Sequence, residues 1–247
     1  MLQCANDLIV QTAKIFRVEG ASVEAEKILV SDSLQETLWR LEEVRYGFRD
    51  KSDRYVREAL DWILTRQGLQ KAYRNLFAPT DQDLRQGLRL PTGELIRSGA
   101  ALRHILGEEA LRTAIAYGLG SSSAAKQAVK GFDQILERGA RSSGTYCCHN
   151  CTIAFLRTIN VVKPKEWDRI LEKGLNKIRE KRTNDGKWHS YPFYYTLLTL
   201  SELDIDLARA ELRYASKAAE RLLNRYRGND RTSRFRKLAL EAALSDT

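Results

Sequence analysis

Apolar residues recur along this chain at the three- and four-residue spacing of one face of a helix. Leu34, Leu38 and Leu41 follow this spacing in the first clear example. Ser33 precedes them and, with Glu36 three residues later, predicts a helix that starts with a reciprocal capping box. The alternation of apolar and polar residues that indicates strands is nearly absent. The pattern therefore predicts an all-α protein built from stacked antiparallel helix hairpins.

The pattern is least regular over residues 75–91, where Pro79 and Pro91 interrupt it. This stretch is the one candidate for a long connection or a domain seam. We therefore expect an N-terminal helical segment, residues 1–90, and a helical-hairpin repeat domain, residues 91–247, with the alternative that both belong to one domain. The helices expected in the second part are 93–106, 108–118, 121–139, 146–160, 165–181, 191–204, 206–227 and 231–244.

Two segments of the second half resemble each other. Residues 132–159 and 175–203 each consist of a charged helix, a glycine turn, an aromatic residue and a more apolar helix. Superimposing Gly144 on Gly186 places Tyr146 on Trp188. A unit of this kind cannot bury both of its faces alone, so we expect neighbouring units to stack.

The second unit also resembles a known family. Its turn, residues 185–188, reads Asp-Gly-Lys-Trp, similar to the Asp-Gly-x-Trp signature of the α/α-toroid superfamily, which includes terpene cyclases and protein prenyltransferase β subunits. Residues 193–196 read Phe-Tyr-Tyr-Thr, similar to the Phe-Tyr-His-Thr stretch of the prenyltransferases. The resemblance implies a partial or small α/α toroid that binds, and in one version transforms, an apolar isoprenoid-like molecule in a central concavity. The residues expected near this ligand are Thr145, Cys147, His149, Trp188, His189, Tyr191 and Tyr195.

The cysteines of the first unit raise the question of a metal. The resemblance places Cys147 at the cysteine position of the prenyltransferase zinc site, but Thr145 and Tyr195 stand where that family has its aspartate and histidine. On a helix, Cys147 and Cys151 share a face, and the superposition puts His189 opposite Cys147. Our candidate zinc ligands are therefore Cys147, Cys151 and His189. The alternatives are thiols that only pack in a helix and a thiolate nucleophile at a helix N-terminus. No other cofactor is expected, and no catalytic residue is indicated.

The charge of the chain supports a rival function. The 41 Lys and Arg residues exceed the 32 Asp and Glu residues, for a net charge of +9 and a pI near 9.4. Most of the excess lies in residues 163–187 and 205–247. A basic helical-repeat module could bind nucleic acid or another polyanion along such a face. Its candidate contacts are Arg225, Arg227, Arg231, Arg234, Arg236 and Lys237. A protein-interaction scaffold without chemistry is the third possibility.

The remaining features concern the compartment. No apolar run reaches the roughly 18 residues of a transmembrane helix, and residues 1–9 lack the zones of a secretory signal. These features predict a cytoplasmic protein. Its four cysteines, Cys4 and the three at 147–151, are too few and too clustered for a disulfide framework, so we expect reduced thiols. We expect His104 to be a partly exposed polar position.

Overall fold

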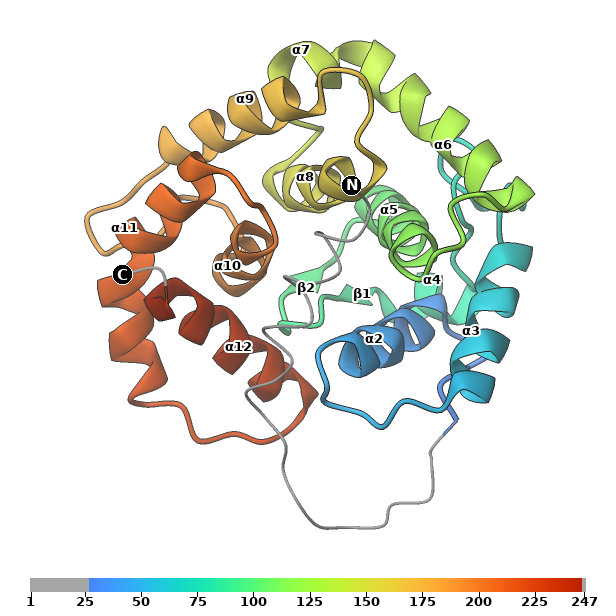
Figure 1. Cartoon of the computed structure of the whole chain (residues 1–247), viewed down its shortest axis with the longest axis horizontal. Coiled ribbons are helices and arrows are strands. Elements are labelled where there is room, and N and C mark those ends of the chain that lie inside the picture. Colours follow the sequence, from blue (N-terminus) through green and yellow to red (C-terminus); the bar gives the residue numbers. More distant parts are fainter. Residues whose placement is uncertain (1–26, 246–247) are drawn as a thin grey trace.

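Helices in the structure alternate along the chain between an inner and an outer row (Figure 1). The structure is a computed structural model that describes residues 27–245. The inner row consists of α2 (Leu34–Arg45), α5 (Gly99–Ala116), α8 (His149–Val162), α10 (Phe193–Ser201) and α12 (Arg231–Ser245). The outer row consists of α3 (Asp53–Thr65), α6 (Ser123–Ile135), α9 (Trp167–Arg179) and α11 (Asp206–Leu223). The all-α prediction is confirmed.

Short elements connect the longer helices. Helix α4 (Asp81–Gln86) and a two-stranded antiparallel hairpin, β1 (Leu88–Arg89) with β2 (Leu95–Ile96), lie between α3 and α5. Helix α4 and β1 lie within residues 75–91, the irregular stretch that the sequence suggested as a connection, and β2 follows it. Between α6 and α8, a π-helical segment (Leu136–Ala140) leads into α7 (Arg141–Ser143). Within residues 27–245, no helix combines the length and the apolar composition needed to cross a membrane.

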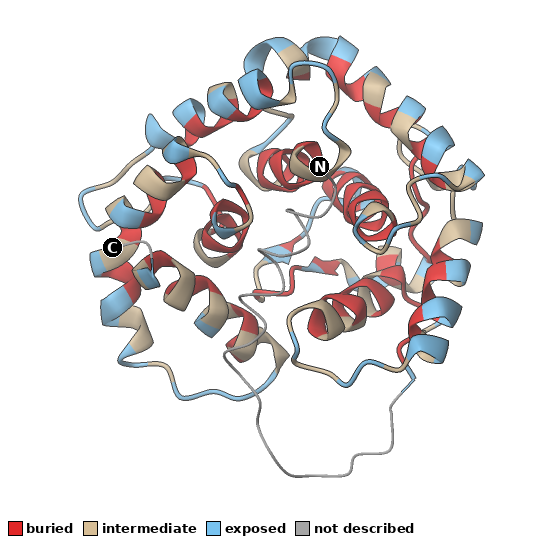
Figure 2. Cartoon of the chain, viewed as in Figure 1, coloured by how far each residue is buried: buried red, intermediate tan, exposed pale blue. Residues whose placement is uncertain are grey.

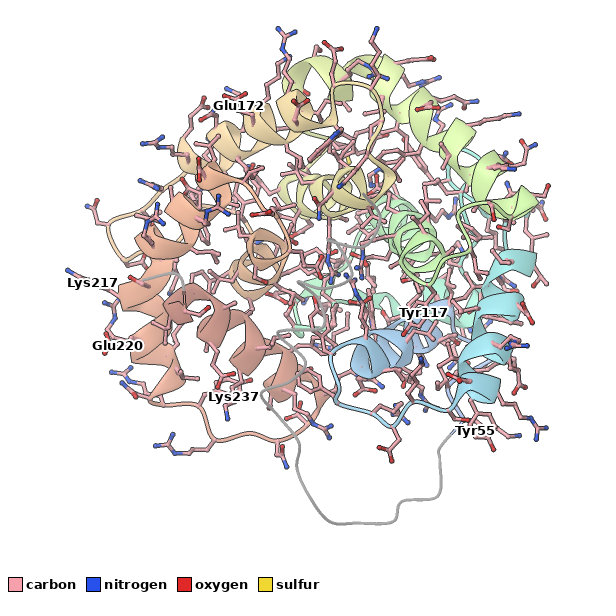
Figure 3. All side chains as sticks on the ribbon, viewed as in Figure 1. Tyr55, Tyr117, Glu172, Lys217, Glu220 and Lys237 are labelled. Atoms are coloured by element: carbon pink, nitrogen blue, oxygen red, sulfur yellow. The ribbon has the colours of Figure 1, made fainter. Side chains whose placement is uncertain are left out.

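Helices α2, α5, α8 and α10 of the inner row are buried over more of their surface than the outer helices, whereas α12 buries a single stripe (Figure 2). In α10, every residue from Tyr195 to Leu200 is buried. In α9, the buried residues recur at helical spacing, at Ile170, Leu171, Gly174, Leu175 and Ile178. A helix buried on all sides needs apolar residues all round, whereas an outer helix needs one apolar stripe. The outward faces carry charge, as Glu172, Lys217 and Glu220 show (Figure 3).

Two sequence expectations about helix limits are wrong in detail. Residues 93–106 and 108–118 were expected as separate helices, but residues 99–116 form the single helix α5, and β2 lies before it at Leu95–Ile96. Gly107 lies inside it because a side chain there would collide with Leu76, so this glycine permits close packing and does not end the helix. At α2, the Ser33 hydroxyl accepts the backbone N–H of Glu36 at 3.0 Å, as expected. The Glu36 carboxylate does not complete the capping box, because it pairs with Arg40 and Arg231.

The first and last helices of the inner row are joined by ion pairs and aromatic contacts. Arg231 of α12 lies 2.6 Å from Glu36 and 3.0 Å from Glu43 of α2. The next turn of α12 places the Phe235 ring edge-on against Phe48, with ring centroids 5.4 Å apart. Arg234 donates to the carbonyl oxygen of Phe48 at 2.9 Å. The other neighbours in the inner row are also in contact: α2 with α5, α5 with α8, α8 with α10, and α10 with α12 (Figure 1).

A charged cluster lies between the inner helices. We define the central cluster as three carboxylates and three guanidinium groups from α2, α5, α8 and the end of α10: Glu42, Arg45, Glu109, Arg112, Arg157 and Glu202. Arg157 binds three acids, at 2.8 Å (Glu202), 3.0 Å (Glu42) and 3.1 Å (Glu109). Both Arg112 and Arg157 are fully buried. The equal number of opposite charges allows the group to stay ionised in the interior.

The pKa shifts in the central cluster follow from these pairs. Burial by itself would raise the pKa of Glu202, but the adjacent Arg157 and Arg112 hold it well below its usual value. The pKa of Glu109 is likewise lowered, because Arg112 and Arg157 outweigh its burial. Two tyrosines complete the network: Tyr195 donates its hydroxyl to Glu109 and Tyr46 donates to Glu202.

Replacing Arg157 by Met should destabilise the protein by about 3–5 kcal/mol, because it leaves three buried carboxylates short of their shared partner. The matched control is Arg169→Met on α9. Arg169 is two-thirds exposed and faces one acid, Glu166, at 3.5 Å, so its loss should cost less than about 1 kcal/mol. Urea denaturation followed by circular dichroism measures both. Equal losses for the two variants would contradict a structural role for the central cluster.

A glycine turn positions the segment that leads into α8. Gly144 has a φ of +70°, and a methyl group there would collide with the backbone of Gly174 in α9. Gly186, its counterpart in the second unit, has a φ of +83° and lies against Ala218 of α11. Each turn therefore approaches the outer helix that follows it.

Gly144→Ala should destabilise the protein by roughly 2 kcal/mol more than Gly139→Ala. Both glycines have a positive φ, but a methyl group at Gly139 has open space around it, whereas at Gly144 it meets the backbone of α9. Comparison of the two thermal unfolding midpoints separates backbone strain from the steric clash. Similar shifts in the two variants would show that the approach to Gly174 is not tight.

Candidate functional site

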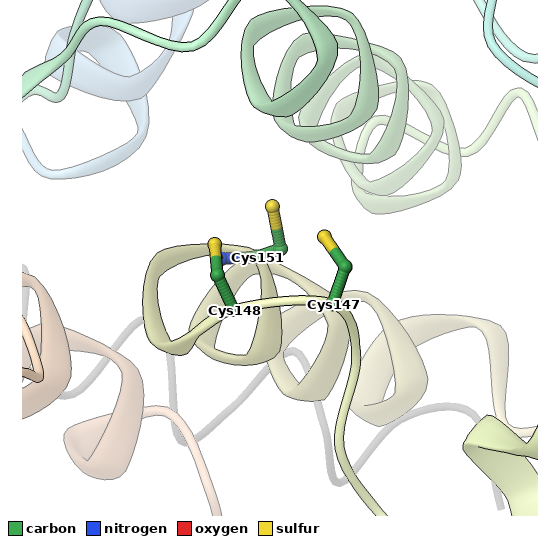
Figure 4. A group of neighbouring side chains, drawn as sticks. All are labelled: Cys147, Cys148 and Cys151. Atoms are coloured by element: carbon green, nitrogen blue, oxygen red, sulfur yellow. The ribbon is translucent and has the colours of Figure 1, made fainter.

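Three thiols gather at the start of α8 (Figure 4). The Sγ atoms of Cys147, Cys148 and Cys151 all lie within 4.8 Å of one another. Cys147 and Cys148 are exposed, whereas Cys151 is buried in the first turn of the helix. No other group of three potential metal ligands occurs within residues 27–245. We call these residues the thiol cluster.

The helix start determines the state of the thiols. Cys148 is the N-cap residue of α8, and its Sγ accepts the backbone N–H of Cys151 at 3.5 Å. A hydrogen bond from the Cys151 thiol, together with backbone N–H groups, lowers the pKa of Cys148 to about 5. The same hydrogen bond and burial raise the pKa of Cys151. Burial also raises the pKa of Cys147. One exposed thiolate therefore lies beside two protonated thiols at neutral pH.

The segment before the thiol cluster is held by Thr152. The Thr152 hydroxyl accepts the backbone N–H of Tyr146 at 3.0 Å and donates to the carbonyl oxygen of Cys148 at 2.9 Å. The Tyr146 ring stacks on the imidazole of His104 from α5, with centroids 4.1 Å apart. Its hydroxyl is hydrogen-bonded to that of Tyr73. These contacts give Cys147 and Cys148 a defined backbone position although both are exposed.

The expectation that His104 is partly exposed is wrong. His104 is 1% exposed, because α5 is covered on all sides by its neighbours, and burial lowers its pKa to about 3. Its Nε2 lies 3.2 Å from Oε1 of Glu108, another fully buried residue. Neither side chain makes a hydrogen bond of ordinary geometry. Burial, and then the neighbouring Glu109, raise the pKa of Glu108 well above its usual value. Burial therefore favours the neutral form of both groups.

The residues predicted around a ligand fall into two groups, one near the surface and one buried in the interior. The loops 145–148 and 188–192 meet where the His149 and Tyr191 rings make an edge-on contact, with centroids 4.4 Å apart. We call this region, at the starts of α8 and α10, the mouth. Thr145 is half-buried in the first loop, and His189 is exposed in the second.

Trp188 and Tyr195 lie deeper than the mouth. Trp188 is 3% exposed and donates its indole N–H to Glu211 at 2.9 Å. Tyr195 is fully buried and belongs to the hydrogen-bond network of the central cluster. Both aromatic residues therefore have internal partners.

The thiol cluster differs from the predicted zinc ligands in one member. Cys147 and Cys151 come together as expected, and the third ligand atom near them belongs to Cys148, not to His189. The sequence suggested His189 of the next unit as the third ligand. Cys148 reaches the cluster because it is the N-cap residue, so its side chain turns back over the first turn of α8. The fourth cysteine, Cys4, lies outside the described residues.

The residues proposed for polyanion binding have different environments. Arg231 and Arg234 join α12 to α2 and its following loop, as described above. Arg236 donates to the carbonyl oxygen of Thr92 at 2.7 Å and stacks on Tyr194. Arg225, Arg227 and Lys237 are exposed. Half of the residues predicted to bind a polyanion therefore hold α12 against the N-terminal part of the described chain.

No relative of known function was found for this chain. Searches with protein-family models, against curated proteins and against solved structures found no match.

Substitution of Glu108 and of Glu109 by Gln should change the free energy of unfolding at pH 7 in opposite directions. Glu108 takes up a proton on folding, so it costs stability above pH 4.5, the pKa of a free Glu, and Glu108→Gln should raise the free energy of unfolding at pH 7. Glu109 is ionised in the fold and contributes stability above pH 4.5. Glu109→Gln should therefore lower the free energy of unfolding at pH 7. Both differences should shrink on acidification towards pH 4. Urea titrations over this range test the signs, and a destabilised Glu108→Gln variant at pH 7 would contradict a neutral Glu108.

Proposed function

We propose that this protein binds a zinc ion through Cys147, Cys148 and Cys151 and uses the fourth coordination position to hold a substrate at the mouth. The single observation that carries the proposal is the proximity of the three Sγ atoms, within 4.8 Å of one another. Tetrahedral zinc with Zn–S bonds of about 2.3 Å needs sulfurs about 3.8 Å apart, so small side-chain movements suffice.

The donor set indicates an open site. Structural zinc sites have four protein ligands, whereas catalytic sites have three and leave one position for water or substrate. The described residues supply three ligands, two of which are exposed. The N-terminal N–H groups of α8 partly offset the negative charge of three thiolates. Zinc bound here would lower the pKa of a water or thiol at the open position.

The surroundings favour a ligand at the mouth. We propose that the alternating inner and outer helices are a small α/α toroid and that the glycine turns at Gly144 and Gly186 mark equivalent positions in its repeats. The resemblance predicted an apolar, isoprenoid-like ligand among the inner helices. The central cluster lies between these helices and Tyr195 is fully buried, so we place such a ligand beside Tyr191 and His149, next to the thiol cluster.

Purified protein should contain one zinc ion per chain, and Cys147→Ser, Cys148→Ser and Cys151→Ser should each weaken zinc binding more than about 100-fold, since even residues behind the ligands contribute 10- to 100-fold. Elemental analysis gives the stoichiometry, and competition with a chromogenic chelator gives the affinity. Cobalt substitution should produce an intense thiolate-to-cobalt charge-transfer absorption that each variant reduces.

The control variants are His189→Ala and Cys4→Ser, which should bind zinc as the parent protein does. Loss of zinc in His189→Ala with retention in Cys148→Ser would restore the ligand set predicted from the sequence. Protein without zinc that fails to take up zinc or cobalt after reduction would overturn the proposal.

A further inference from the structure

The thiol cluster contains a second arrangement with chemistry of its own. Cys148 and Cys151 are separated by two residues at the beginning of a helix of 14 residues. The first is exposed and the second is buried. Their sulfurs lie within 4.8 Å of each other, and the Cys151 backbone N–H points at the Cys148 Sγ. An accessible sulfur with a buried partner sulfur close to it suits a two-step exchange of disulfides.

We propose that, in the metal-free protein, Cys148 and Cys151 form a dithiol pair that exchanges with low-molecular-weight disulfides, with Cys148 as the attacking and Cys151 as the resolving residue. This activity goes beyond the proposed zinc site and uses two of the same sulfur atoms, so a bound zinc ion would block it.

The exchange balances with a disulfide R–S–S–R as the oxidant. The Cys148 sulfur attacks one sulfur of the substrate, the S–S bond breaks, and the first R–S⁻ leaves and takes up a proton. The Cys151 thiol then gives its proton to water, and its sulfur attacks Cys148 Sγ and releases the second R–S⁻, which takes up a proton from water. The protein loses two electrons to form the Cys148–Cys151 disulfide, and the substrate becomes two thiols.

The structure assigns different roles to the two exposed cysteines. Cys148 is the N-cap residue of α8 and accepts the backbone N–H of Cys151, and its sulfur lies within 4.8 Å of the buried Cys151 sulfur. Cys147 is adjacent to Cys148 in the chain, and a disulfide between neighbouring residues would distort their planar trans peptide bond. We therefore expect Cys147 to be dispensable for the exchange, although it is required for zinc.

The test uses the full chain in a Cys4→Ser background, which leaves the thiol cluster as its only cysteines. The protein is reduced, freed of metal with a chelator and mixed with glutathione disulfide. We expect two glutathione molecules released per chain and one intramolecular disulfide, which peptide mapping by mass spectrometry assigns to Cys148 and Cys151. Cys151→Ser should stop after the first step, with one glutathione attached to Cys148.

Cys147→Ser and Cys148→Ser are the matched controls, because each removes one exposed thiol of the cluster and serine still caps a helix at position 148. Cys147→Ser should exchange at the parental rate, and Cys148→Ser at least tenfold more slowly. Circular dichroism of each variant checks the fold. A disulfide that includes Cys147, or equal rates for the two variants, would overturn the assignment.

Zinc separates this inference from the proposed function. Protection of the parent protein from glutathione disulfide by one equivalent of zinc would support both. Exchange without any zinc binding would refute the zinc site alone. Zinc binding without exchange in the metal-free protein would refute the dithiol pair alone.

Discussion

The buried ion pairs between the inner helices constrain everything else in this fold. Arg157 reaches carboxylates from α2, α5 and the end of α10, so one side chain connects helices that are far apart in sequence. Buried charges tolerate little displacement, because a lost partner leaves an uncompensated charge in a medium of low dielectric. The central cluster therefore specifies how the inner helices face one another. It also fills the space between the inner helices with polar groups.

Because the space between the inner helices is filled, the accessible reactive side chains of this region lie at the starts of α8 and α10. With Tyr195 engaged by Glu109, the exposed potential ligands of this region lie in the loops before α8 and α10. There the thiol cluster combines a helix N-terminus, a fixed backbone and two accessible sulfurs. We propose that the three sulfurs hold a zinc ion and that two of them, those of Cys148 and Cys151, exchange disulfides as a dithiol pair in the metal-free protein. Metal occupancy and thiol oxidation would then exclude each other, which links the site to the redox state of its surroundings.

The largest differences between the sequence predictions and the structure concern the locations of charged residues. The arginines of 225–237 were grouped as one basic surface, but Arg231, Arg234 and Arg236 attach α12 to the first part of the chain. Glu42, Glu109, Arg112 and Glu202 were not identified as core residues. One signal was present: Arg157 is the only Lys, Arg, Asp or Glu of α8, in a segment otherwise suited to burial. Its partners come from 45 to 115 residues away, and local spacing contains no information about such distant pairs.

The sequence by itself determined the helical class and most helix positions, because helical spacing of apolar residues is a local property. It also suggested that Cys147 and Cys151 lie close together, but from a shared helical face, whereas Cys147 precedes α8 in the structure. The tertiary structure decided which helices became inner, that Gly107 and Gly144 allow close approach between elements, and that His104 and Glu108 are buried. It also decided that Cys148, as the cap of α8, takes the place expected for His189. These outcomes depend on which surfaces meet in space, and that is set by the packing of all the helices together.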